Sequence, residues 1–234
     1  LANGGEGIYV DNRLPLSPLL HTMQTVTFWV VGSANEWLAR FWSALAGTAV
    51  VFGPMVIRRR IGDYTAVVAM LLLAVSPVML TVSRNGDGLT LAILCGLSMA
   101  GGWEWFIVQR DRRGLILGAT AFGAGLASGP QFVTILFLGG VTFLMRPINV
   151  GRFWMQLRPQ IPKLVMPAGL TFILGATAIL QYPLGLSAVG ESWYGWFSNW
   201  ETLESSRAML LIPVLAVMHE PLVLVLGIAG GYNV

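Results

Sequence analysis

Ionisable side chains inside long apolar segments are the first candidates for function, because a charge in such surroundings costs several kcal/mol. Arg40 and Glu220 meet this description. Glu220 follows His219 and precedes a proline, which weakens a helix and lets a polar pair face a cavity. His219 could instead ligate a haem or chlorophyll, since an imidazole on an apolar helix suits such pigments. Arg40 has a simpler explanation too: Glu36 lies one turn before it, and an i, i+4 ion pair would join them.

Charged residues in the polar segments form a second set of candidates. Arg84 and Asp87 put a cation and a carboxylate three residues apart in a turn between two apolar segments. Glu6 and Asp11 add carboxylates near the start of the chain, and His21 lies in the apolar segment that follows. These residue types do not define a reaction by themselves, because the sequence has no phosphate loop, dinucleotide fingerprint or zinc-binding HExxH. The single cysteine also excludes an intrachain disulfide and a thiolate metal cluster.

Three tryptophans form a further candidate surface. Trp193, Trp196 and Trp200 share one helical face at i, i+3, i+7 spacing. Such a stripe is typical of an interfacial anchor, because indole prefers the headgroup region of a membrane. A platform that stacks on a sugar or a lipid is the alternative interpretation.

The composition predicts that these residues belong to a membrane protein. Hydrophobic residues make up 55% of the chain and charged residues 11%, with a mean hydropathy of +0.70. A soluble domain carries about 25% charged residues, so this chain cannot cover itself with polar surface. We therefore expect an all-α, polytopic helical membrane protein. The net charge of +3 does not indicate nucleic acid, because the basic residues stand at helix ends, where lipid headgroups are the better partner.

Basic residues alternate along the chain in a way that predicts the topology. The runs at 58–60, 110–113 and 146–163 fall in alternate gaps between apolar segments. The positive-inside rule places these gaps on the cytoplasmic side. A span needs about 20 apolar residues, fewer where the ends snorkel. The seven predicted spans are 37–57, 64–83, 88–108, 114–128, 131–146, 163–183 and 207–230.

The same charges decide the place of residues 17–32, which are also apolar. If this segment crossed the bilayer, the first arginine run would face the opposite side from the later ones, so we expect it to lie in the interface. Residues 150–158 predict a second interfacial helix. Residues 1–36 then form an outer loop with a juxtamembrane helix. Residues 37–234 form the transmembrane domain, with an outer loop at 184–206 and a cytoplasmic C-terminus.

Small residues and prolines predict how the helices pack. Gly114 and Gly118 are four residues apart, as are Gly125 and Gly129, and this spacing lets helix backbones approach closely. Prolines inside apolar runs predict kinks. These prolines are Pro54, Pro77, Pro167, Pro213 and Pro221. The topology also brings three outer pieces to one face: residues 1–36, the turn that carries Arg84, and the loop 184–206.

Several short motifs occur in a recognisable order. They are Pro15-Leu16-Ser17-Pro18 followed by His21, Arg40-Phe41-Trp42-Ser43-Ala44-Leu45, Arg58-Arg59-Arg60-Ile61-Gly62, Ser76-Pro77, and Ser83-Arg84 with Asp87. Gly125-Leu126-Ala127 and Glu220-Pro221 fit the same order more weakly. In order and spacing the chain resembles the GT-C membrane glycosyltransferases, in particular the protein O-mannosyltransferase and aminoarabinose-transferase branch, of the family 39 type.

The resemblance implies transfer of a sugar from a polyprenyl-phosphate carrier to an acceptor, on the outer face of a bacterial or archaeal plasma membrane. A carboxylate would act as base or as partner of a divalent metal ion. The candidate carboxylates are Glu6, Asp11 and Asp87. Arg84 and Arg40 would contact the carrier phosphate, because a leaving phosphate needs positive charge or a metal. The tryptophan face would flank the sugar, and His21 belongs to the same substrate-binding set.

Two departures from that pattern support an alternative. The acidic motif of the family would lie before Leu1, so we expect it, with a preceding span, upstream of this sequence. The family often has a lysine after Gly-Leu-Ala, whereas Ser128-Gly129-Pro130-Gln131 is uncharged. The alternative is a non-catalytic structural subunit of a larger membrane complex, with other membrane subunits and a pigment or haem as partners. A transporter would need paired intramembrane charges or inverted repeats, and the sequence has no convincing repeat.

Overall fold

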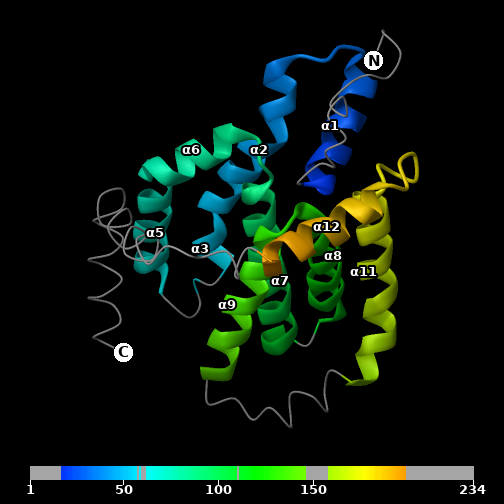
Figure 1. The fold of residues 1–234 in the computed structure, drawn as a ribbon. Coiled ribbons are helices and arrows are strands. Elements are labelled where there is room, and N and C mark those ends of the chain that lie inside the picture. The colour runs from blue at the N-terminus through cyan, green and yellow to red at the C-terminus, as the bar shows by residue number, and fades with distance from the viewer. Residues whose placement is uncertain (1–16, 57, 59–61, 110, 146–157, 199–234) are drawn as a thin grey trace.

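The computed structural model describes residues 17–56, 58, 62–109, 111–145 and 158–198, which form helices and their connections without a strand (Figure 1). The helices are α1 (Pro18–Val31), α2 (Glu36–Val51), α3 (Gly53–Val56), α5 (Asp63–Val75), α6 (Pro77–Asn85), α7 (Leu89–Gln109), α8 (Arg112–Ser128), α9 (Gln131–Met145), α11 (Ile161–Ala176) and α12 (Gly185–Ser198), with the 3-10 helix η1 (Arg158–Gln160) before α11. The prediction of an all-α fold is confirmed for this part of the chain.

Most of the predicted apolar segments coincide with helices in the described residues, but α11 ends at Ala176, so the last part of the predicted span 163–183 is not helical. Segment 88–108 corresponds to α7 and segment 131–146 to α9, and the segment expected in the interface, 17–32, is α1. Segment 37–57 is α2 followed by the single turn α3, and 64–83 divides into α5 and α6. Apolar length, together with glycine and proline breaks, therefore located the helices correctly.

The number of membrane spans differs from the prediction. Helix α7, with 21 residues, is long and apolar enough to cross a membrane, and the bent pair α5–α6 is a second candidate if it forms one span. A helix rises about 1.5 Å per residue, so the 16 residues of α2 or of α11 extend roughly 24 Å, less than the roughly 30 Å of a hydrocarbon core. By length and composition, the described residues do not support seven spans. The reason is that the predicted spans are apolar segments, and these include residues at which the structure breaks or ends a helix. The helices are therefore shorter than the segments.

Two Ser-Pro pairs start helices. Ser17 and Ser76 are the N-cap residues of α1 and α6, and Pro18 and Pro77 follow at the first helical position, where the missing N–H is not needed. The N–H of Met79 donates to Ser76 Oγ at 3.2 Å. This second pair ends α5, and α6 continues at an angle of 59° to it. The predicted kink at Pro77 is thus confirmed as a helix break that carries its own cap.

Helices α7 and α8 approach each other at glycines. A Cβ on Gly102 would lie 2.6 Å from the carbonyl oxygen of Gly114 and 2.7 Å from the nitrogen of Gly118. Because no side chain fits at these distances, the two backbones are in direct contact. The close packing predicted from Gly114 and Gly118 is confirmed. Gly125 has a different role, since it makes room for the ring of Phe132 and not for another helix backbone.

Helix α8 packs against α7 on one side and α11 on the other. Helices α8 and α11 both begin at the lower end of the view and run upward (Figure 1). At their upper ends, a Cβ on Gly175 would lie 3.4 Å from the Cβ of Ala127. Thr171 Oγ1 donates to the carbonyl oxygen of Thr120 at 3.1 Å and links the middle of the two helices. Helices α8 and α11 therefore run parallel, with their first residues at one end of the molecule and their last residues at the other.

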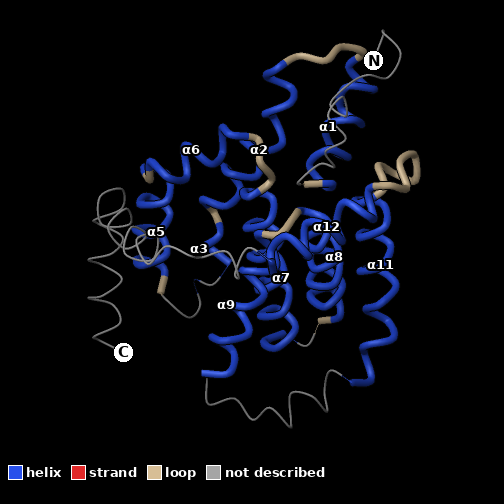
Figure 2. Tube along the Cα trace, in the orientation of Figure 1, coloured by secondary structure: helices blue, strands red, loops and turns tan. Residues whose placement is uncertain are grey.

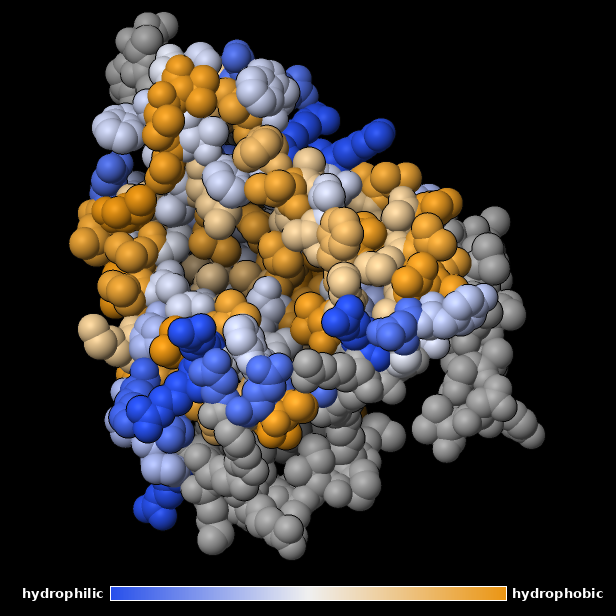
Figure 3. Space-filling view, turned by 180° about the vertical axis from the view of Figure 1, so that it is seen from behind, coloured by the Kyte–Doolittle hydropathy of each residue, from blue (hydrophilic) through white to orange (hydrophobic). Residues whose placement is uncertain are grey.

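Large apolar side chains cover much of the outside of the molecule. On α11, Val165, Met166 and Leu170 are 63%, 77% and 54% exposed. Figure 3 shows hydrophobic side chains over much of one face, with hydrophilic side chains gathered near its top and in its lower part. Exposed apolar surface of this extent marks contact with a membrane or a partner protein.

Candidate binding site where the helix ends meet

The start of α1 meets two turns from distant parts of the chain. A Cβ on Gly88 would lie 2.5 Å from the Cβ of Ser17 and 3.1 Å from the carbonyl oxygen of Ser128. Both serines are buried, and Gly88 has a φ of 81°, a conformation that L side chains rarely adopt. The contact joins the Ser-Pro opening of α1, the α6–α7 turn and the α8–α9 turn. We call Ser17, Gly88 and Ser128 the junction.

Hydrogen bonds and apolar packing hold the junction from several sides. Ser128 Oγ donates to the carbonyl oxygen of Gly125 at 2.6 Å. Thr22 Oγ1 donates to the carbonyl oxygen of Gly175 at 2.7 Å and ties α1 to α11. A buried apolar cluster lies beside them, formed by Leu19, Ala92, Cys95, Ala127, Phe132, Ala176 and Val189. Since this cluster draws on α1, α7, α8, α9, α11 and α12, six helices meet at this end of the molecule.

The connection from α11 to α12 contains strained backbone. Figure 2 shows it as a coiled loop beyond the upper end of α11. Ala178, Ile179 and Leu180 have φ values of 48°, 58° and 69°. Such left-handed conformations cost an L residue about 1–2 kcal/mol each, and they occur most often at functional sites. The strain is offset in part by a hydrogen bond of 2.8 Å from the N–H of Tyr182 to the carbonyl oxygen of Thr177.

Gly185 lets α12 begin directly against α11. A Cβ on this residue would collide with the carbonyl oxygen of Ala176, so only glycine fits. From that start, α12 packs against α1 and α11. The three pieces predicted to converge are residues 1–36, the turn that carries Arg84 and the loop 184–206. The structure brings the start of α1, within 1–36, against Gly88 of the α6–α7 turn, and α12, within 184–206, packs against α1.

Two buried side-chain polar atoms have no hydrogen-bond partner within the part of the chain that the structure describes. They are the acceptor Gln131 Oε1 and the donor Trp193 Nε1. Trp193 packs against the cluster, and Gln131 directly precedes the cluster residue Phe132. A buried unpaired polar atom costs about 1–3 kcal/mol, and native proteins keep such atoms mainly where a ligand or water pairs with them. This pair is the signal that singles out this end of the molecule as a binding site.

The tryptophan stripe faces the protein in part. Trp193 is half-buried on the cluster, and Trp196 Nε1 donates to Thr134 Oγ1 of α9 at 2.9 Å. Trp196 also packs edge-on against Phe197, with ring centroids 4.9 Å apart. These contacts show that Trp193 and Trp196 are held by the protein, and both interpretations of the stripe stay predictions. Trp200 lies outside the described residues.

Arg84, in the last turn of α6, and Asp87, in the α6–α7 turn, lie close in sequence to the junction residue Gly88. Arg84 is exposed in the last turn of α6, where a cation interacts favourably with the helix C-terminus. Asp87 is also exposed, and its Oδ1 accepts from the N–H of Leu89 at 3.1 Å, which caps α7. The carboxylate therefore has a local structural role, and its remaining lone pairs stay available at the surface.

His21 lies in α1, one turn after Ser17. Its backbone N–H donates to the carbonyl oxygen of Ser17 at 3.1 Å. The side chain is half-buried, and burial lowers the pKa of the imidazole below its usual value of 6.5. Desolvation disfavours the charged form, so His21 is neutral at pH 7. It can then both donate and accept a hydrogen bond.

Arg40 is engaged elsewhere. It forms the predicted i, i+4 ion pair with Glu36, at 2.5 Å, and both side chains are exposed. The simpler of the two interpretations is confirmed, because the pair sits at the start of α2 and not inside an apolar environment. Gln24 Nε2 donates to the carbonyl oxygen of Ala39 at 2.7 Å and fixes α1 beside this turn.

The motif around Arg40 has a second role that sequence reasoning missed. Ser43 and Thr90 are fully buried, and their hydroxyl oxygens lie 3.1 Å apart between α2 and α7. Thr90 Oγ1 also lies 3.1 Å from the carbonyl oxygen of Ser43, within donating distance. The signal was a small hydroxyl residue within an apolar helix, since only a hydrogen-bonded hydroxyl is stable there.

Five predicted residues lie outside the described part of the chain: Glu6, Asp11, Trp200, His219 and Glu220. So do 150–157 and the predicted span 207–230. Among the described residues, no group of three or more His, Cys, Asp or Glu side chains is placed to hold a metal ion. The divalent metal ion stays an expectation from the resemblance.

Comparison of the chain with protein families, with curated proteins and with solved structures found no match. The class of protein therefore follows from the structure itself. It is a helical protein with at least one helix long and apolar enough to cross a membrane.

Proposed function

We propose that this protein is a membrane-embedded glycosyltransferase of the GT-C kind, which transfers a sugar from a polyprenyl-phosphate carrier to an acceptor on the non-cytoplasmic face. In this proposal the six described segments from α2 to α11 and the segment 207–230 cross the bilayer. The shorter helices are accommodated by local thinning and by snorkelling of flanking residues.

One observation carries the proposal. The acceptor Gln131 Oε1 and the donor Trp193 Nε1 are buried without a partner among the described residues; Trp193 packs against the apolar cluster, and Gln131 lies at the start of α9, three residues after Ser128 of the junction. A sugar hydroxyl both donates and accepts, so a sugar can pair with either atom. The half-buried indole also offers an apolar surface on which a sugar ring packs.

Charge at the rim of the site suits a phosphate carrier. Arg84 is exposed at the edge of the junction and is free to hold a phosphate. Asp87 would partner a divalent metal ion or the acceptor, and neutral His21 would hydrogen-bond the sugar or the acceptor. Arg40, paired with Glu36, has a lesser part in this proposal.

The experiment measures sugar transfer by the full chain reconstituted in liposomes with a radiolabelled polyprenyl-phosphate hexose. Release of free sugar from the carrier is followed as well, because it requires no particular acceptor. Arg84→Gln should raise KM for the carrier about tenfold or more, the loss of one charge-assisted hydrogen bond. Trp193→Phe keeps the packing but removes the donor, and it should lower kcat/KM with little change in stability.

Arg113→Gln is the matched control for Arg84→Gln, because it removes the same exposed charge at the opposite end of the helices. It should leave turnover unchanged. Wild-type protein that neither transfers nor releases any polyprenyl-phosphate hexose would overturn the proposal.

A second function, a non-catalytic subunit of a membrane complex, is favoured by a different observation. Asp87 is used as a helix cap and Arg40 as an ion-pair partner, so two of the candidate site residues have structural roles. The exposed apolar face of α11 would then contact other subunits. Purification in mild detergent tests this directly: co-purifying subunits or a pigment absorption band would support it, and a colourless monomer would count against it.

A further inference from the structure

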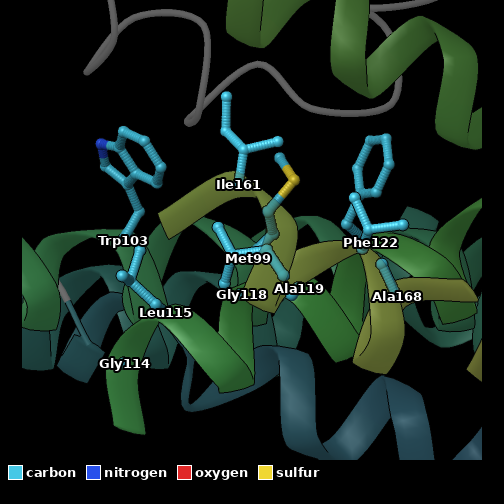
Figure 4. A pocket seen from close by; sticks show the side chains of 11 residues that line it. Met99, Trp103, Gly114, Leu115, Gly118, Ala119, Phe122, Ile161 and Ala168 are labelled. Carbon is cyan, nitrogen blue, oxygen red and sulfur yellow. The ribbon is translucent and has the colours of Figure 1, made fainter. Parts of the chain in front are cut away.

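The opposite end of α8 carries a separate feature, a pocket between α7, α8 and α11. Its volume is about 290 Å³, close to the lower limit of about 300 Å³ for ligand sites. Every lining residue is apolar or aromatic. In Figure 4, Trp103 and Phe122 stand at the two sides of the pocket with Met99 and Ile161 between them. A site with almost no polar surface selects a hydrocarbon and not a sugar.

Two arginines are spaced in line with the lining residues: Arg112 at the start of α8, and Arg158 in the 3-10 helix η1 directly before α11. On α8, Arg112 precedes the lining residues Leu115 and Ala119 by three and seven positions, so it continues their stripe. On the other side, Arg158 precedes the lining residues Ile161 and Val165 by three and seven positions. Helices α8 and α11 start at the same end of the molecule (Figure 1), so the two arginines lie at the end from which both helices begin.

The charge of this end is strongly positive. Arg112, Arg113, Arg158 and Lys163 are all exposed, and no ion pair joins them to another described residue. The carboxylates nearest in sequence are Glu104 and Asp111, and Asp111 Oδ1 accepts from the N–H of Arg113 at the start of α8. Four cations therefore face at most two carboxylates. The charge favours an anion at the mouth of an apolar pocket.

We propose that this pocket, between α8 and α11 (Gly114, Leu115, Ala119, Ile161, Val165 and Ala168), binds one acyl chain of an anionic phospholipid from the surrounding bilayer, with the phosphate between Arg112 and Arg158. The exposed apolar side chains of α11 continue the pocket toward the lipid. Arginine suits the phosphate because its guanidinium makes two parallel hydrogen bonds. The site depends on membrane embedding and is independent of any sugar chemistry.

The test is lipid titration of the full chain in detergent, read by native mass spectrometry, with phosphatidylglycerol compared against phosphatidylcholine. A basic residue near an anionic lipid contributes about a fivefold preference, so two should give roughly 25-fold. Arg112→Gln with Arg158→Gln should reduce that preference to near parity. The matched control removes the same charge from the same helix starts but off the stripe: Arg113→Gln with Lys163→Gln.

The control pair should keep most of the preference. Equal loss in both pairs would overturn the proposal in favour of unspecific attraction by net charge. Equal binding of the two lipids by wild-type protein would overturn it as well.

Trp103 reports on the acyl chain. In nanodiscs with brominated phosphatidylglycerol, a fraction of the tryptophan emission should be quenched, and that fraction should disappear in Trp103→Phe. Val165→Phe narrows the pocket from its exposed edge and should weaken the quenching without unfolding the protein. Quenching that is identical in wild type and Trp103→Phe would show that no chain enters the pocket.

Discussion

The two ends of α8 differ in the groups that surround them: one end buries polar groups, and the other borders an apolar pocket. At its C-terminal end the junction buries the hydroxyl groups of Ser17 and Ser128, and glycine at position 88 lets the chains touch. At its N-terminal end the pocket is lined by apolar side chains and edged by exposed cations. Helix α8 thus carries two sites: one at its C-terminal end that demands polar partners, and one at its N-terminal end that admits any flexible hydrocarbon chain.

The difference has a physical origin. Buried polar groups need partners at defined distances and angles, so the junction tolerates few changes and selects its ligand by geometry. Apolar contact is non-directional and scales with area, so the side chains that line the pocket tolerate substitution, and charge at the mouth selects the ligand. Gly114 is the exception in the lining, because a Cβ there would lie 2.5 Å from the carbonyl oxygen of Gly102. Substitutions at the two ends should therefore differ in cost.

The largest effect is expected for Gly185→Ala, next to the junction. The new Cβ would collide with the carbonyl oxygen of Ala176, and a backbone oxygen cannot move aside as a side chain can. We expect a loss of about 3 kcal/mol or more in unfolding free energy, measured by thermal or denaturant unfolding in detergent.

Gly190→Ala is the control on the same helix, because a Cβ there meets nothing within 4 Å. At the pocket end, Gly118→Ala should also be mild, since its Cβ would lie 3.6 Å from the carbonyl oxygen of Met99, an ordinary contact. If Gly118→Ala cost as much as Gly185→Ala, the contrast between the two ends would not hold.

A middle effect is expected for Ser17→Ala. It removes the side chain that accepts from the N–H of Leu20 and caps α1, so we expect a loss of about 1 kcal/mol. Ser33→Ala, just beyond the end of α1, removes an exposed hydroxyl and should change stability by less than about 0.5 kcal/mol. If Ser17→Ala and Ser33→Ala had the same midpoint of unfolding, the cap at Ser17 would contribute nothing to stability.

The smallest effect concerns pH. Burial lowers the pKa of His21 in the folded protein, so below pH 6.5 the unfolded chain binds more protons at this residue than the folded one does. Its contribution to stability is therefore complete above about pH 6.5 and decreases as the pH falls below that value. His21→Asn should weaken the decrease of Tm between pH 7.5 and 5.5, and an unchanged slope would contradict the assignment.

Sequence by itself determined the helical class, the positions of the helices and the close packing at Gly114 and Gly118. These features are local or compositional: apolar length, Ser-Pro and glycine breaks, and the absence of a Cβ act within a few residues of chain. The Arg40–Glu36 pair was also predictable, because it spans one turn of one helix.

Tertiary structure decided what those helices build. The Ser43–Thr90 bond joins residues 47 positions apart, and the junction joins the start of α1 to two turns from other parts of the chain. That Arg112 and Arg158 lie at the same end of the molecule likewise depends on α8 and α11 running parallel, although they are not consecutive helices. No pattern along the sequence specifies these contacts, because they follow from how whole helices pack, and packing energy is shared among many residues of every helix.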